Sequence, residues 1–99
     1  MNGYRLTPEA EIDLQNIYEW GFLTFGEDSA DKYHLGLLDR FKKLASSPLL
    51  CQTVDHICEG ARRAVHGKNS IYYKIIDVDY HILIIGVLGQ QDPSSRFSE

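Results

Sequence analysis

The sequence lacks a long apolar run. Its longest one, residues 82–88, is far shorter than the roughly 20 apolar residues that a membrane-spanning helix needs. Polar residues also stand at the very N-terminus, where a secretory signal would lead into an apolar core. We therefore expect a cytoplasmic protein that does not enter a membrane.

Cysteine is scarce as well. Six residues separate the two cysteines, Cys51 and Cys58, whereas zinc knuckles and redox pairs have two residues between theirs. In a reducing cytoplasm both are expected to be free thiols. Together with His56 they offer three metal ligands, but no fourth ligand stands at a suitable spacing. The sequence therefore predicts no disulfide framework, no metal site and no cofactor.

An excess of basic residues is absent too. The net charge is −4, and residues 1–50 hold eight acidic residues against five basic ones. Direct binding to nucleic acid is therefore not expected, because the phosphate backbone attracts basic proteins. A length of 99 residues with a hydrophobic fraction of 43% suits one globular domain, which we assign to residues 1–99.

The first half predicts two helices. Thr7, Pro8 and Glu9 combine an N-cap hydroxyl, a proline in the first turn and a carboxylate near the positive helix end, and Gly26 is placed to end this helix. Apolar residues then repeat every three or four positions and define one buried face on each helix. These residues are Ala10, Leu14, Ile17, Gly21 and Phe25 in the first helix, and Ala30, Tyr33, Leu37, Phe41, Leu44 and Ala45 in the second.

The second helix is expected to take its cap from residues 27–29 and to end at Ser46-Ser47-Pro48. Because only a few residues join the two helices, they are expected to pack as an antiparallel hairpin.

The second half changes to the alternating pattern of β-strands. Residues 82–85 are apolar on both faces, so the last strand is predicted to be central and covered by the helices on one side. We predict an α+β fold in which the helix hairpin packs on a small, mainly antiparallel β-sheet. The other segments are a short strand at 4–6, a connecting segment at 49–60, strands at 61–66, 70–77 and 80–88, turns at 67–69 and near 78–79, and a polar tail at 90–99 that is expected to be flexible.

Four of the ten basic residues fall within residues 62–76, a segment without acidic residues. They are Arg62, Arg63, Lys68 and Lys74. Because side chains alternate along a strand, Arg62 and Arg63 are predicted on opposite faces of the sheet. We interpret these cations as contacts for an acidic partner. The alternative is that they are solvated surface residues.

Three aromatic residues are candidates for partner contacts. Tyr72 and Tyr73 must point to opposite sides of the sheet, so we expect one in the core with a satisfied hydroxyl and the other outward at an interface. Trp20 does not belong to the predicted buried face of its helix. It either anchors a partner or packs at the edge of the helix hairpin.

Several motifs, in this order and spacing, resemble the ParE branch of the RelE/ParE toxin superfamily. They are L-T-P-E-A-E-x-D-L at residues 6–14, L-A-S-S-P at 44–48, the Arg62-Arg63 pair, and I-Y-Y-K-I at 71–75, and the resemblance covers residues 4 to about 93. It implies the RelE/ParE toxin fold and the toxin of a bacterial type II toxin–antitoxin pair, with a role in plasmid or chromosome maintenance. It also implies a ParD-like antitoxin that wraps the toxin, and inhibition of DNA gyrase by binding and not by catalysis.

The same superfamily offers an alternative, a ribosome-dependent messenger-RNA endonuclease of the RelE type, whose Lys, Arg and late Tyr or His steady the scissile phosphate. Gly89-Gln90-Gln91 stands where such relatives often have a histidine or arginines, and it offers neither a cation nor a general acid. A further alternative is a degenerate toxin that retains only antitoxin binding. Cleavage of messenger RNA, in the endonuclease alternative, would need four residues to converge near the tail: Arg63, His66, Lys68 and Lys74.

Asp13 occupies the D-L position of the first motif. No second carboxylate is placed to work with it, so we expect it to support the helix hairpin or a strand cation and not to take part in catalysis.

Overall fold

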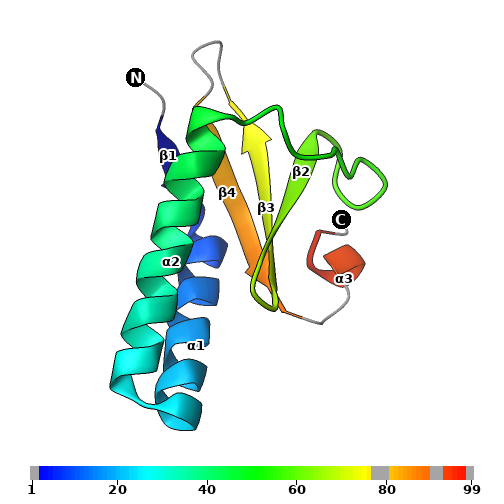
Figure 1. Ribbon diagram of the computed structural model, residues 1–99. Coiled ribbons are helices and arrows are strands. Elements are labelled where there is room, and N and C mark those ends of the chain that lie inside the picture. The colour runs from blue at the N-terminus through cyan, green and yellow to red at the C-terminus, as the bar shows by residue number, and fades with distance from the viewer. Residues whose placement is uncertain (1–2, 77–80, 90–92, 98–99) are drawn as a thin grey trace.

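The computed structural model describes residues 3–76, 81–89 and 93–97. Two helices form a hairpin that lies against one face of a four-stranded sheet, and a short third helix lies on the other side (Figure 1). The predicted α+β class is confirmed. In chain order the elements are β1 (Tyr4–Leu6), α1 (Pro8–Phe25), α2 (Glu27–Ser46), β2 (Ala61–His66), β3 (Asn69–Ile75), β4 (Ile82–Leu88) and α3 (Pro93–Phe97).

The strand order is β1-β4-β3-β2, with β1 parallel to β4 and the other pairs antiparallel. The predicted three-strand meander and the central place of β4 are confirmed. The strand predicted at 70–77 starts one residue earlier and ends sooner, as β3 at Asn69–Ile75, and the strand predicted at 80–88 starts later, as β4 at Ile82–Leu88. Residues 77–80, which include the turn predicted near Val78-Asp79, lie outside the described residues.

The first helix starts and ends where the sequence predicts. The Ala10 amide donates to the Thr7 hydroxyl at 3.1 Å, and Pro8 occupies the first helical position. Gly26 ends the helix with φ 95°, a conformation that glycine adopts without steric cost. Gly26 is also the N-cap of α2 and supplies no side chain, so the cap predicted from residues 27–29 is wrong. Glu27 and Asp28 still place negative charge in the first turn of α2.

One predicted core position is wrong. Ala10 and Leu14 are buried on α1, but Phe25 is 66% exposed. The tip of the hairpin, where α1 ends and α2 begins, extends beyond the end of the sheet (Figure 1). No strand therefore lies under Phe25 to bury it.

The main core lies between the hairpin and the sheet. Each large apolar side chain that it buries stabilises the fold by about 1.5–3 kcal/mol. Its fully buried members with large side chains are Leu37, Phe41, Ile71, Tyr73, Ile82 and Ile84.

A second, smaller cluster lies on the opposite face of the sheet. It contains Val54, Ala61, Tyr72 and Leu88, with Phe97 of α3 packed against it. The ring of Phe97 lies 5.2 Å from that of Tyr72 and fits over Gly86, where an added Cβ would lie 3.0 Å from the Phe97 ring. The sequence assigned residues 93–97 to a polar tail and did not predict α3, whose Phe97 covers an apolar part of the sheet.

The two tyrosines point to opposite faces, as predicted, but neither points to solvent. Tyr73 is fully buried in the main core and donates its hydroxyl to the Pro48 carbonyl at 2.8 Å, and burial raises its pKa. Tyr72 is only 3% exposed, because Phe97 covers it. The prediction of an outward tyrosine is therefore wrong, and neither ring can contact a partner without a rearrangement of the fold.

None of the helices among the described residues is both long and apolar enough to span a bilayer.

Candidate partner-binding site

A groove of about 740 Å³ lies between the helix hairpin and the far end of the sheet. The helices, the β2–β3 turn and the end of β4 all contribute to its walls. Much of the lining is apolar or aromatic, and Lys68 brings a positive charge from the turn. The side chains that shape it include Ile17, Trp20, Phe25, Tyr33, Lys68 and Val87.

Several large apolar side chains on α1 are exposed, and two of them, Trp20 and Phe25, line the groove. Trp20 is 60% exposed, and its ring meets that of Phe25 edge-on at 5.6 Å. Leu23 is 83% exposed, and Ile12 and Phe22 are exposed as well. Trp20 therefore lies open at the groove wall and is not buried in the hairpin. Exposed aromatic side chains at the wall of an apolar groove indicate an interaction site.

The sequence of α1 already indicates this surface, because it has more apolar residues than the predicted buried face accounts for. Ile12, Phe22 and Leu23 fall outside the three-to-four spacing of that face, so α1 carries more apolar residues than one face can bury. A helix that is apolar on several sides needs a second partner.

The β2–β3 turn is tied to α2 at the end of the groove. The Tyr33 hydroxyl donates to the His66 carbonyl at 2.9 Å and lies 2.6 Å from the side-chain amide oxygen of Asn69. Gly67 has φ 58°, and a Cβ there would lie 2.8 Å from the Tyr33 hydroxyl oxygen. The turn therefore needs glycine at this position, both for its backbone conformation and for the approach of Tyr33.

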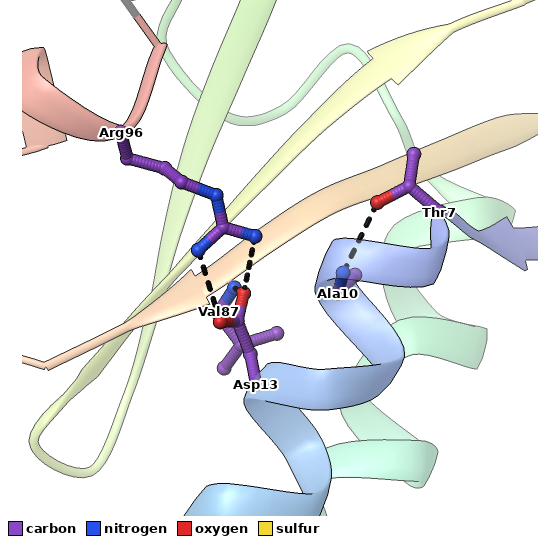
Figure 2. A network of polar contacts seen from close by, with 5 residues as sticks. All are labelled: Thr7, Ala10, Asp13, Val87 and Arg96. Carbon is purple, nitrogen blue, oxygen red and sulfur yellow. Dashed lines mark hydrogen bonds and ion pairs between the residues drawn. The ribbon is translucent and has the colours of Figure 1, made fainter.

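Asp13, which also lines the groove, is at the centre of a polar network (Figure 2). One of its oxygens accepts the backbone N–H of Val87 in β4 at 3.0 Å. Its two oxygens also accept from the two terminal nitrogens of Arg96 at 2.9 and 2.8 Å. The hydrogen bond to Asp13 raises the pKa of Arg96. Asp13 thus holds α3 and β4 to α1, a structural role that agrees in kind with the prediction, although its cation comes from the tail and not from a strand.

Arg96 is a residue that the sequence did not single out. It is one arginine in a polar tail, and 83 positions separate it from Asp13. No local pattern reports a contact of that range.

The predicted cations lie on both faces of the sheet. Arg62 faces the helices and donates to the Cys51 carbonyl at 2.6 Å, which holds the connecting segment. Arg63 lies on the other face, is exposed, and donates through Nε to the Ser70 hydroxyl at 3.0 Å. Lys74 shares this second face and is half-buried. The predicted opposition of Arg62 and Arg63 is confirmed.

The four residues that catalysis would need do not form one cluster. Arg63 and Lys74 belong to the second face of the sheet, whereas His66 packs on the helix side, with its ring 5.3 Å from that of Tyr33. Lys68 lies in the β2–β3 turn at the groove. Gly89 also lines the groove, and Gln90 and Gln91 lie outside the described residues.

We expect His66 to make the stability of the fold depend on pH. Burial, and then the positive charge of Arg40, hold the pKa of His66 below its ordinary value of about 6.5. Below pH 6.5 the unfolded chain therefore binds more protons than the native chain, and stability falls as the pH falls toward the native pKa. We expect the wild type to lose more stability between pH 7 and 5.5 than the His66→Gln variant, as measured by urea unfolding at both pH values. The other histidines are common to both proteins, so an equal loss in the two would contradict this role.

Comparisons with known proteins agree on one family. The family model described as the ParE toxin of the type II toxin–antitoxin system parDE matches residues 4–93. Toxin ParE1 of Caulobacter vibrioides is 29% identical over 90 residues, which cover 91% of each chain. Toxin ParE1 of Mycobacterium tuberculosis is 26% identical over 72 residues, which cover 73% of this chain and 74% of that protein.

Two solved structures share the fold. A chain of the chromosomal ParDE system from P. aeruginosa superimposes with a TM-score of 0.76 at 18% identity, covering 92% of this chain and 98% of that one. A chain of the toxin–antitoxin complex RelBE2 from Mycobacterium tuberculosis gives a TM-score of 0.68 at 18% identity, with coverage of 90% and 98%.

Proposed function

This chain belongs to the family of ParE toxins of type II toxin–antitoxin systems, and we propose that a ParD-like antitoxin neutralises it and that the free toxin inhibits DNA gyrase, and so replication, by binding. No cofactor is needed for an inhibitor of this kind. Antitoxin binding and gyrase inhibition are supported by different features of the molecule.

The observation that supports antitoxin binding is the groove, with exposed apolar residues of α1 beside it. Its volume of about 740 Å³ suits bulky apolar anchors, and its walls come from three separate parts of the chain. An amphipathic helix that presents anchors at every third or fourth position would fill such a groove. Trp20 and Phe25 offer rigid aromatic contacts, and Lys68 offers a positive charge to an acidic residue of the antitoxin.

Inhibition by binding, and not by cutting RNA, is supported by the dispersal of the cations. A phosphate-transfer site gathers its cations and its general acid or base around one reacting group. In the described part of the chain Arg63 and His66 lie on opposite faces of the sheet. The resemblance to the ParE branch adds the expectation of gyrase as the target.

The test is induction of the chain alone in bacteria, followed by assays for gyrase-dependent DNA breaks and for cleaved messenger RNA in the same culture. We expect broken DNA, intact messages, and rescue by co-expression of a ribbon-helix-helix protein encoded beside the toxin. Cut messages with intact DNA would overturn the proposal in favour of the endonuclease. Absence of both lesions, with the antitoxin still bound, would identify a degenerate toxin.

A further inference from the structure

The second face of the sheet, opposite the hairpin, is only partly covered. Residues around Val54 and the helix α3 pack over Ala61, Tyr72 and Leu88. The part toward β1 carries a row of residues in register across three strands. Arg5 of β1 pairs with Leu83 of β4, and Leu83 pairs with Lys74 of β3, so the three side chains share this face.

This row is positively charged, and within the described residues no acidic side chain belongs to the strands that carry it. Arg5 is exposed and Lys74 is half-buried, and neither forms an ion pair within the described residues. None of the described strand residues is acidic. Arg63, also exposed on this face, lies one strand beyond Tyr72 and adds a third cation.

Apolar side chains lie among these cations. Leu83 stands between Arg5 and Lys74 and is only half-buried. Ile85 is half-buried too, and Ile76 is 43% exposed directly after β3. A nucleic-acid backbone would gain nothing from these apolar atoms, and the net charge of −4 would oppose its approach. An acidic protein surface that also carries apolar residues matches both features.

We propose that the row Arg5, Leu83 and Lys74 binds an acidic, partly apolar segment of the protein that this toxin inhibits, on a surface separate from the antitoxin groove. The inference rests on the proposed function, because it names the surface through which the target is held.

The spacing of the row limits what can bind. Neighbouring strands lie about 4.8 Å apart, so the Cα atoms of Arg5 and Lys74 lie about 10 Å apart. Two carboxylates at positions i and i+7 of a helix are separated by about 10.5 Å along its axis. An apolar residue at i+3 or i+4 would then face Leu83.

The experiment compares charge reversal on the row with charge reversal elsewhere. The variant Arg5→Glu/Lys74→Glu is purified beside the control Lys32→Glu/Lys42→Glu, which makes the same change in net charge on exposed positions of α2. Inhibition of gyrase supercoiling, affinity for the gyrase protein, DNA binding and affinity for the antitoxin are measured for both, together with the wild type. The charge-neutral variant Arg5→Gln/Lys74→Gln serves if the reversed variant fails to fold.

We expect the row variant to inhibit gyrase at least about 30-fold less strongly than the wild type while it keeps its antitoxin affinity, and the control to retain both. Unchanged gyrase inhibition by the row variant would overturn the inference alone. Loss of antitoxin affinity instead would assign the row to the antitoxin interface, and loss of DNA binding with unchanged affinity for gyrase protein would assign it to nucleic acid. A wild type that does not inhibit gyrase would overturn the proposed function itself and the inference with it.

Discussion

Replacing Asp13 with alanine is expected to lower the free energy of unfolding by about 3 kcal/mol. The carboxylate accepts one backbone N–H from β4 and two N–H groups from Arg96, and its side chain is only 13% exposed. Its removal leaves the Val87 amide and a guanidinium that is 23% exposed without their acceptor. Loss of a partner from a largely buried pair is costly because the remaining charge stays desolvated.

Urea unfolding at constant slope measures this change, and a domain of this size should also melt roughly 12–20 °C lower. The matched variant Asp13→Asn keeps an acceptor for Val87 but removes the charge, so it should lose less stability than the alanine variant. A loss below about 1 kcal/mol for Asp13→Ala would mean that the network does not hold α3 and β4 to α1.

Replacing Trp20 with alanine is expected to weaken antitoxin binding about 100-fold, provided that the antitoxin occupies the groove. Trp20 lies at the groove wall and packs edge-on against Phe25, so its indole offers a large rigid contact. Because the side chain is 60% exposed in the free chain, its loss should change the stability of the toxin alone by less than about 0.5 kcal/mol. Isothermal titration calorimetry with the purified antitoxin measures the affinity.

Leu50→Ala is the control for this variant. Leu50 is 84% exposed in the connecting segment after α2 and does not line the groove. The control should bind the antitoxin as the wild type does. Equal affinities for the wild type and Trp20→Ala would move the antitoxin to another surface of the chain.

The connecting segment, residues 49–60, shows how a stretch without a pattern can still be ordered. Arg63 donates its amide to the Gln52 carbonyl, and the Val54 amide donates to the Ala61 carbonyl, so the segment runs beside β2. Its sequence has no period because only Val54 among residues 52–56 is buried. A pattern in the sequence needs a repeated contact, and this segment is held by one buried side chain, Val54, and by hydrogen bonds to β2 that leave no periodic mark.

Short-range chemistry allowed the sequence by itself to determine the helix hairpin, the meander and the family. The Thr7 cap, the Pro8 start, the Gly26 stop, the alternation of β2 and β3 and the apolar run of β4 all act between residues that are near in the chain. These signals do not depend on contacts with distant parts of the chain, and the structure has the predicted elements at these places.

Only the tertiary structure decided which apolar residues lack cover and what the tail does. Phe25 has the spacing of a core residue but lies where the hairpin extends beyond the sheet, and Tyr72 has the position of an outward residue but lies under Phe97. Arg96 and Asp13 meet across 83 positions. Burial depends on the summed geometry of several elements, and an ion pair of that range depends on where both of its elements come to rest, so neither leaves a local pattern in the sequence.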